Sequence, residues 1–393
     1  MMEQKNLVPK RRFKEFQNTS AWEQRRLGDV AEISAGGDID KTKLSGFGKY
    51  PVIANALTND GIIGYYENDF RIEAPAVTVT GRGDVGHAQA RKTNFTPVVR
   101  LLSVKSKHDV DFLEHAINKH KVLVESTGVP QLTSPQLANY KIWFTSLEEE
   151  KKIGRFFCSL DNLITLHQRK LEKMKAIKSA YLSEMFPAEG ERVPKRRFAG
   201  FTQAWEQRKL GDMVEEIIDN RGKTPPIVSS SQYPLLEVAS LGNDTPDYSK
   251  VTKYVDKETY KNWFRQHIKK GDILFATVGN TGVTAMMDGA HQATIAQNIV
   301  GFRPNEKFNS EFMLQMFNLP GNLKKAKRIE MGAVQPSVKV SQLIDVKYSV
   351  PSKEEQVKVG TFFANLDHLI TLHQRKLEKL QNIKKAYLNE MFV

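Results

Sequence analysis

Two long amphipathic stretches dominate the pattern of apolar and polar positions along the chain. Between Phe156 and Met185 there is no glycine or proline, and apolar residues recur at alternating steps of four and three. A stretch near the C-terminus, within residues 360–392, repeats this spacing. An average step of 3.5 residues is typical of a coiled-coil seam, so we predict two long helices that pack on each other. A helix of about 30 residues spans roughly 45 Å.

The seam positions follow from this spacing in both stretches. They are Leu160, Ile164, His167, Leu171, Met174, Ile177 and Tyr181 in the first stretch, and Leu366, Ile370, His373, Leu377, Leu380, Ile383 and Tyr387 in the second. The opposite face of the first stretch carries Arg169, Lys170, Lys173 and Lys178, which predicts a surface exposed to solvent. Since a histidine in a helix–helix seam is usually a hydrogen-bonded core residue, we assign no catalytic role to His167 or His373. An ordinary core helix in its own domain is the alternative for each stretch.

The chain also repeats itself. The sequence V-P-K-R-R-F occurs at 8–13 and again at 193–198, and residues 21–29 match residues 204–212. Residues 154–186 and 360–392 are identical at 24 of 33 positions. The chain therefore resembles a two-part cycle that is cut at one linker, and such a cycle predicts that its termini lie near each other.

Two variable segments interrupt the repeats, residues 34–127 and 218–331, and they share no run that aligns with confidence. We predict a mixed α/β (α+β) fold with two globular domains, joined by two long antiparallel coiled-coil helices and related by a pseudo-two-fold. The predicted boundaries are 1–147 for the first globular domain, 148–192 for the central helix and linker, 193–353 for the second globular domain, and 354–393 for the C-terminal helix. The helices are expected to act as a rigid spacer between the domains.

Each variable segment contains a strand followed by a glycine-rich turn. The strands are predicted at 76–80 and 272–278, and the turns at 81–86 and 279–282. A phosphate-cradling loop is one interpretation, but no Gly-Lys-Ser/Thr follows either turn. A tight turn is the simpler interpretation, and its backbone amides are still able to contact DNA phosphates.

Composition narrows the class of protein. The chain has 393 residues, enough for about 2.6 domains. It has one cysteine, Cys158, which excludes an internal disulfide and a cysteine-based zinc site, so a reducing cytoplasmic location is expected. No apolar run is long enough to cross a membrane, and no membrane partner is predicted.

The net charge is +13 and the pI is near 9.5, which favours a polyanionic partner, most often nucleic acid. Arg, Lys, Asn and Gln are the side chains suited to base edges. Candidate DNA-binding residues in the variable segments are Lys41, Lys43, Asn55, Arg71, Arg82, Arg91, Lys92, Asn220, Arg221, Lys223, Arg265, Gln297 and Asn298.

Motifs for catalysis are missing from the sequence. The only Pro-Pro pair, Pro225-Pro226, lacks the flanking residues of the motif with which adenine methyltransferases hold a flipped base. The sequence has no P-loop, no His-Glu-x-x-His and no Gly-x-Ser-x-Gly. We therefore predict a two-headed binding protein without catalytic residues, metal or cofactor of its own.

The layout resembles the DNA specificity subunit of type I restriction–modification enzymes. The resemblance covers essentially the whole chain and depends on the duplicated architecture more than on any short motif. The matching residues are Trp22–Asp29 and Trp205–Asp212, Gly128–Gln131 and Gly332–Gln335, Glu148–Gly154 and Glu354–Gly360, and Phe157-x-x-Leu160-Asp161 and Phe363-x-x-Leu366-Asp367.

This resemblance implies that each variable segment is a target recognition domain for one half of a split, asymmetric double-stranded DNA sequence. It also implies two docked modification (methyltransferase) subunits, which carry S-adenosylmethionine, and restriction subunits, which use ATP and Mg²⁺. Two other hypotheses remain: a coiled-coil protein–protein adaptor without DNA sequence preference, and a self-contained restriction or modification enzyme.

Overall fold

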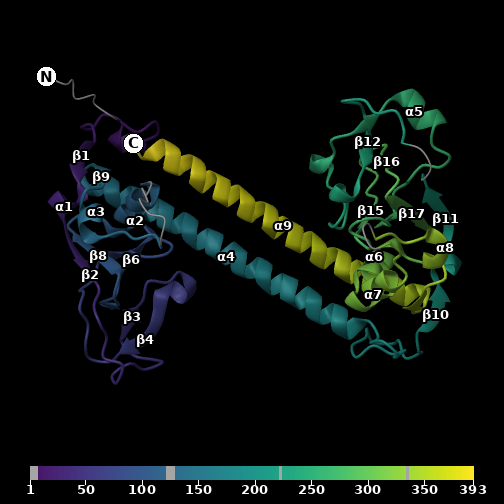
Figure 1. Ribbon diagram of the computed structural model, residues 1–393, viewed down its shortest axis with the longest axis horizontal. Coiled ribbons are helices and arrows are strands. Elements are labelled where there is room, and N and C mark those ends of the chain that lie inside the picture. Colours follow the sequence, from purple (N-terminus) through teal and green to yellow (C-terminus); the bar gives the residue numbers. More distant parts are fainter. Residues whose placement is uncertain (1–7, 121–128, 221–223, 333–335) are drawn as a thin grey trace. The chain divides into compact units, whose positions relative to one another are not determined.

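The computed structural model describes residues 8–120, 129–220, 224–332 and 336–393. The chain forms two compact units, each built from segments that are distant in sequence. Unit 1 comprises residues 1–168 and 375–393, and unit 2 comprises residues 169–374 (Figure 1). Among the described residues, no helix combines the length and the hydropathy that a membrane-spanning segment needs.

Unit 1 contains a four-stranded antiparallel sheet in the order β2-β8-β5-β6. The strands are β2 (Ala31–Ala35), β8 (Leu101–Ser106), β5 (Ala76–Thr80) and β6 (Ala88–Arg91). All five residues of β5 are buried, which confirms the predicted strand at 76–80. Helix α2 (Val110–Lys119) contacts β5 and β6, and the Asp109 carboxylate caps its start by accepting from the Phe112 amide.

A second, three-stranded sheet of unit 1 has the order β4-β3-β7. Its strands are β3 (Tyr50–Ile53), β4 (Ile62–Tyr66) and β7 (Thr96–Pro97), with the short helix η2 (Thr58–Gly61) before β4. Strand β3 pairs antiparallel with β4 and parallel with β7. Because only residues 98–100 separate β7 from β8, this small sheet is tied to the large one.

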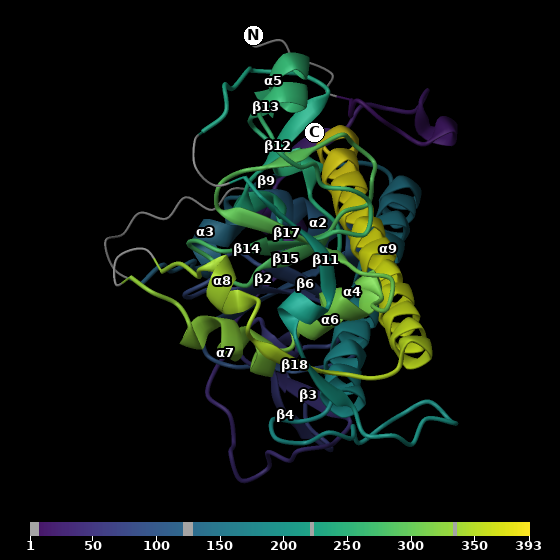
Figure 2. The ribbon, with the colours of Figure 1, turned by 90° about the vertical axis from the view of Figure 1, so that its right-hand side faces the viewer.

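Unit 2 repeats both sheets, although the variable segments do not align in sequence. Its large sheet has the order β11-β17-β14-β15 and its small sheet the order β13-β12-β16. The strands are β11 (Val214–Asp219), β12 (Tyr233–Leu236), β13 (Tyr254–Val255), β14 (Ile273–Ala276), β15 (Thr284–Met286), β16 (Thr294–Ile295) and β17 (Ile299–Pro304). Strand β12 pairs antiparallel with β13 and parallel with β16, as β3 does with its neighbours. Helix α6 (Ser310–Asn318) packs against β14 and β15 (Figure 2).

Short elements complete each unit. In unit 1, β1 (Glu23–Arg26) pairs with β9 (Lys141–Phe144), and in unit 2, β10 (Glu206–Lys209) pairs with β18 (Lys347–Val350). The remaining elements are η1 (Lys14–Phe16), α1 (Leu27–Val30), α3 (Ser134–Ala138), η3 (Leu210–Asp212), η4 (Val238–Ser240), η5 (Tyr248–Lys250), α5 (Lys257–Asn262), α7 (Pro320–Arg328) and α8 (Val340–Leu343).

The two predicted long helices are α4 (Leu147–Met185) and α9 (Lys353–Met391), each of 39 residues. Helix α4 begins beside the predicted segment boundary at 148 and nine residues before Phe156, where the stretch without glycine or proline starts. Its first turn contains Glu148, Glu149 and Glu150, and negative charge stabilises a helix N-terminus. The start of α4 packs into the core of unit 1, and the start of α9 packs into the core of unit 2.

Beyond those turns the helices pack on each other within each unit, as predicted. In unit 1, Phe156 contacts Tyr387 and Asp161 pairs with Lys384, so the two helices run in opposite directions. In unit 2, Tyr181 contacts Phe362 and Lys178 pairs with Asp367, again antiparallel. The seam positions of both helices are buried or partly buried, with Leu160 and Leu171 among the buried side chains.

One prediction about the polar helix face is wrong. Lys178 is not a solvent-facing charge, because its Nζ lies 2.5 Å from Asp367 Oδ1 and its side chain is 21% exposed. Position 178 is close enough to the seam for a long side chain to reach across to the other helix. Arg169, Lys170 and Lys173 are exposed, as predicted.

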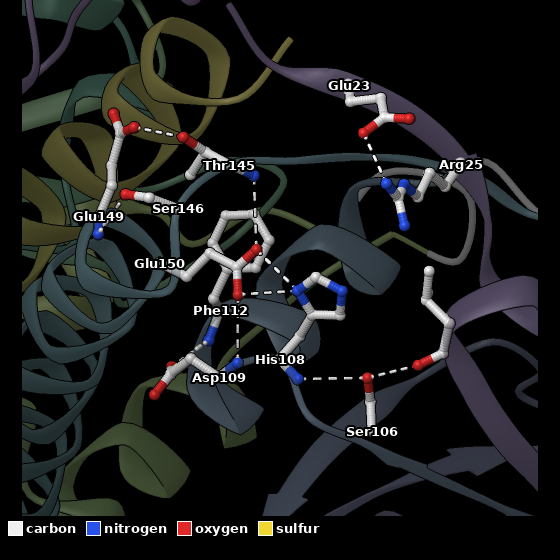
Figure 3. A network of polar contacts seen from close by, with 11 residues as sticks. Glu23, Arg25, Ser106, His108, Asp109, Phe112, Thr145, Ser146, Glu149 and Glu150 are labelled. Carbon is white, nitrogen blue, oxygen red and sulfur yellow. Dashed lines mark hydrogen bonds and ion pairs between the residues drawn. The ribbon is translucent and has the colours of Figure 1, made fainter. Parts of the chain in front are cut away.

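A buried polar network joins the start of α4 to the rest of unit 1 (Figure 3). The Glu150 carboxylate is fully buried and lies 2.9 Å from His108 Nδ1. It also accepts weakly from the backbone amides of Asp109 and Thr145. The neighbouring Glu149 accepts two hydrogen bonds from the Arg12 guanidinium, at 2.7 and 2.6 Å. One helix turn therefore anchors the repeated N-terminal segment, the start of α2 and the end of β9.

The repeated N-terminal segment V-P-K-R-R-F also contacts the C-terminal helix. The Arg11 amide donates to the Glu390 carbonyl oxygen at 2.9 Å, and the two side chains form an ion pair. In unit 2, Arg196 makes the same backbone and side-chain contacts with Glu184. The end of α9 thus meets the first V-P-K-R-R-F as the end of α4 meets the second, so the first described residues lie beside the C-terminal helix, as the predicted cycle requires.

Candidate nucleic-acid interface

In unit 1 the small sheet meets the predicted glycine-rich turn between β5 and β6. Asn55, just after β3, clamps this turn: its Nδ2 donates to the Arg82 carbonyl oxygen at 2.6 Å, and its Oδ1 accepts from the Gly81 amide at 2.7 Å. Gly83 has φ +73°, which favours glycine. The turn is therefore held rigidly, and it presents the exposed Arg82 side chain to solvent.

The corresponding turn of unit 2 lies between β14 and β15. Gly279 and Gly282 have φ values of +80° and +88°, and the Gly279 amide donates to the Pro336 carbonyl oxygen. In unit 1 the Gly83 amide donates in the same way to Pro130. Both segments are thus tight turns joined to the chain that follows the variable segment.

An open groove of about 520 Å³ lies beside this turn in unit 2. Its lining includes Gln297 and Asn298, which follow β16, and Val278, which precedes the glycine turn. Gln297 Nε2 donates to Thr224 Oγ1 at 3.0 Å. Asn220 Nδ2 lies 3.4 Å from Thr294 Oγ1, beside the same strand. Amides and hydroxyls of this kind are the groups that read base edges.

The structure brings some predicted residues of unit 2 together and separates others. Asn220, Gln297 and Asn298 gather at or next to the groove. Arg265 is exposed and lies after α5, on the segment that also carries the exposed Trp263. Arg221 and Lys223 lie outside the described residues.

In unit 1, Asn55 and Arg82 come together at the glycine turn, but Arg91 and Lys92 have partners elsewhere. Arg91 donates to Thr78 Oγ1 at 3.0 Å and to the Asp60 carbonyl oxygen at 2.9 Å, and burial lowers the pKa of its guanidinium. Lys92 forms an ion pair with Asp111 at 2.8 Å. Arg91 therefore has a structural role within the unit, whereas Lys92, 58% exposed, stays at the surface.

The remaining predicted residues of unit 1 lie on and around the connection between β2 and β3. Lys41 and Lys43 are exposed on it, and Lys43 pairs with Asp69. Arg71 reaches the Asp38 carbonyl oxygen at the start of the connection. Phe47 lies on this same connection, between two glycines in a lysine-rich run, and was not among the predicted DNA-binding residues.

One cluster has the composition of a metal site. Glu114, His115 and Asp161 offer ligand atoms within 4.8 Å of one another. However, Lys384 Nζ lies 2.5 Å from Asp161, and the Ala90 amide donates to Glu114. Burial acts to raise the pKa of Asp161, but hydrogen bonds from His115 and Lys384 outweigh it and lower that pKa. Contacts within the protein therefore account for the cluster.

Unit 2 supports this structural interpretation, because a glutamine replaces the histidine there. Gln315 Nε2 donates to Asp367 at 2.9 Å, and Lys178 pairs with the same aspartate. In unit 1, His115 Nε2 lies 3.0 Å from Asp161. Because Gln315 replaces His115 in the same geometry, His115 acts as a hydrogen-bonding partner of the aspartate rather than as a metal ligand.

Comparisons with known proteins agree with this arrangement of two equivalent units. The family model described as the type I restriction modification DNA specificity domain matches residues 19–176 and 202–382. The chain is 23% identical to the type I restriction enzyme MjaVIII specificity subunit of Methanocaldococcus jannaschii, over 94% of this chain and 91% of the relative. A putative MjaX specificity subunit from the same organism is 24% identical over 94% of this chain and 92% of its own length.

A solved structure shares the fold. It is the S subunit of a type I restriction–modification system from M. genitalium, with a TM-score of 0.70 and 16% sequence identity. The match covers 98% of this chain and 99% of that one. The family model alone spans most of the chain, in two copies that correspond to the two repeats. The chain therefore belongs to the family of type I restriction–modification DNA specificity domains, as its sequence layout predicted.

Proposed function

We propose that the chain is the DNA specificity subunit of a type I restriction–modification complex, and that each unit reads one half of an asymmetric split target. The observation that carries this proposal is the pairing of one scaffold with two different surfaces. Both units have the same strand order and tie a tight glycine turn to the chain that follows the variable segment, while the residues around that turn differ. A duplicated scaffold with different reading surfaces suits two different half-sites, whereas a true homodimer suits a palindrome.

We further propose that the chain itself has no catalytic residues or cofactors and acts through partners. Two modification subunits would methylate adenine with S-adenosylmethionine, and restriction subunits would use ATP and Mg²⁺. Exposed leucines support the docking of two copies of one partner. Leu163 and Leu166 on α4 are 44% and 47% exposed, and the repeated run places Leu369 and Leu372 on α9 at 45% and 38%.

The test is a map of N6-methyladenine. The chain is expressed with its cognate modification subunit in a methylation-free host, and the modification subunit alone is the control. We expect a new motif with two different halves and a fixed gap. An inverted-repeat motif would contradict the asymmetric target. A chain that forms no complex, or a complex without DNA sequence preference, would instead favour the protein–protein adaptor. Membership of the family does not favour that alternative.

A substitution in the groove of unit 2 tests which half of the DNA motif this unit reads. Gln297→Ala removes one amide from the groove of unit 2, so we expect relaxed specificity in one half of the motif only. Gln342→Ala, which removes an exposed amide of α8 that does not line the groove, is the control and should leave the motif unchanged. Relaxation of both halves by Gln297→Ala would contradict the assignment of one half-site to each unit.

The spacer hypothesis has its own test. Insertion of seven residues into each of α4 and α9 lengthens both helices by about 10 Å. If the helices set the gap between the half-sites, the methylated motif should gain about three base pairs of gap, since base pairs stack about 3.4 Å apart. Unchanged spacing in a complex that still methylates would exclude this role for the helices.

A further inference from the structure

The connection between β2 and β3 displays an apolar side chain that the fold does not use. Phe47 is 83% exposed, more than any other large hydrophobic side chain among the described residues. It stands between Gly46 and Gly48. Isolated exposed apolar residues are common, so the exposure of Phe47 gains meaning only from the residues that support and flank it.

The tip is held in place by its surroundings. Ser45 and Tyr65 exchange two backbone hydrogen bonds, at 3.1 and 2.9 Å, which fasten the connection to β4. The Tyr66 hydroxyl donates to the Asp40 carbonyl oxygen at 3.0 Å. A Cβ on Gly48 would lie 2.9 Å from the Tyr65 Cβ, so only glycine allows this close approach. Phe47 is therefore presented by an ordered support, which reduces the entropy lost on binding.

The charged residues in the segment around the phenyl group are all lysines. Residues 41–50 contain Lys41, Lys43 and Lys49 and no carboxylate. Lys43 pairs with Asp69, while Lys41 and Lys49 form no ion pair with any described residue. An apolar tip between lysines matches a DNA duplex better than an apolar protein pocket, because phosphates lie on both sides of every base-pair step.

We propose that Phe47 is a wedge that inserts between two adjacent base pairs of the half-site bound by unit 1, with Lys41 and Lys49 at the flanking phosphates. This inference rests on the proposed DNA-reading function. Unstacking costs least at flexible pyrimidine–purine steps, so the wedge adds a preference for the sequence of one step without hydrogen bonds to its bases. The equivalent connection of unit 2, residues 220–232, contains no aromatic residue. The kink is therefore confined to one half-site.

The test uses the full chain assembled with its cognate modification subunit and duplexes that carry the mapped motif. 2-Aminopurine replaces adenine at successive steps of each half-site. Each modification subunit flips its target adenine, so signals at and beside those adenines are set aside. At the remaining positions we expect a fluorescence increase at one step of the unit 1 half-site and none in the other half. Phe47→Ala should abolish the increase and weaken target binding by about tenfold or more, since stacking on an aromatic side chain contributes strongly to binding. Phe47→Leu should retain part of both effects.

Matched controls separate the possible outcomes. Val8→Ala removes another exposed apolar side chain of unit 1, 47% exposed, and should change neither readout. Lys49→Gln should weaken binding and reduce the salt dependence by about one phosphate contact, whereas Phe47→Ala should leave that slope unchanged.

Two results would overturn the wedge. One is a wild-type complex that binds its target while Phe47→Ala matches it in affinity and fluorescence. The other is loss of the modification subunit from the Phe47→Ala complex, which would place the phenyl group in a protein interface. A wild-type complex without sequence preference would instead refute the proposed function.

Discussion

The two units of this protein build one framework from variable segments that do not align in sequence. Each has a four-stranded antiparallel sheet and a three-stranded sheet with the same strand order and directions. Tyr50-Pro51 opens the central strand of the small sheet in unit 1, and Tyr233-Pro234 opens it in unit 2. The units therefore differ in the residues that this shared framework presents and in added helices of unit 2 such as α5 and α7.

Buried polar residues at equivalent positions of the two units differ in charge but keep equivalent hydrogen bonds. Glu150 in unit 1 accepts from the Asp109 amide, and the neutral Gln356 in unit 2 accepts from the Asn309 amide. His115 and Gln315 face the equivalent aspartates of the two long helices in the same way. The comparison indicates that hydrogen-bond geometry at these positions matters more than the charge that supplies it.

The largest predicted effect comes from a contact that the units share without change. Arg12 binds Glu149 and Arg197 binds Glu355, each through two hydrogen bonds, and both carboxylates are essentially unexposed. Arg197→Ala leaves a buried carboxylate unpaired and should lower the free energy of unfolding of unit 2 by about 3–5 kcal/mol. Urea unfolding, with hydrogen exchange to locate the change, measures it.

Arg12→Ala should have an equal effect in unit 1. The double variant Arg197→Met/Glu355→Met should recover most of the loss, because it removes both charges together. A loss below about 1 kcal/mol in either unit would show that the repeated arginine is not an anchor of its unit.

The second effect tests a close approach that both units need. A Cβ on Gly154 would lie 2.3 Å from Asp109 Oδ1, and a Cβ on Gly360 would lie 2.4 Å from Asn309 Oδ1. Alanine at either position should destabilise its unit by about 1–3 kcal/mol through overpacking. Gly321→Ala is the control, because nothing lies within 4 Å of a Cβ there. Equal melting of all three variants would contradict the prediction.

The third prediction concerns a buried carboxyl group of unit 2 and the pH dependence that it gives to the stability of this unit. In unit 2, burial and the neighbouring Asp367 raise the pKa of Asp244 to about 6. The folded state then holds a proton that the unfolded state has lost, so the contribution of Asp244 to stability falls as pH rises from about 4 through 6. Asp244→Asn should therefore stabilise unit 2 by about 1–2 kcal/mol at pH 7.5 and have little effect at pH 4.

Urea unfolding at the two pH values measures this difference. Asp345→Asn replaces an aspartate that is 66% exposed and serves as the control. The same stabilisation by Asp244→Asn at both pH values would refute the titration of Asp244 as its cause.

The smallest effect is an exchange between the units. His115→Gln should change the free energy of unfolding of unit 1 by less than about 0.5 kcal/mol, because Gln315 already makes the equivalent contact in unit 2. His115→Ala removes the contact with Asp161 and should cost about 1–3 kcal/mol. Thermal melting of both variants separates them. Equal destabilisation by the two would show that the imidazole has a role that an amide cannot supply.

Parts of the fold were predictable because their signals are local or repeated. The two helices follow from periodicity, and the strand at 76–80 follows from its residue types and the turn after it. The contact between the first described residues and the end of α9 follows from the repeat of V-P-K-R-R-F. In contrast, the buried ion pair of Lys178 was not predictable, since its partner Asp367 is distant in sequence and belongs to the other helix.

The candidate DNA-binding residues, which were chosen by residue type, also fall into two groups. The structure places some of them at a groove and holds others inside the unit. Gln297 and Asn298 are adjacent in sequence and lie together on one groove. Arg91 looked equivalent to Arg82 in the sequence, yet it is held by Thr78 and Asp60 inside the unit. Whether a polar side chain is free to meet a ligand depends on neighbours that only folding supplies.

The sequence by itself determined the duplicated architecture, the long helices and the class of protein, because repeats and periodicity are written along the chain. Only the tertiary structure decided that the two variable segments share one strand order, since sheet pairing joins residues whose identities follow no local code. It also decided which charges are buried in pairs and which side chains, Phe47 above all, stand in solvent. Those outcomes depend on long-range packing, where the free energy of each contact is set by groups distant in sequence.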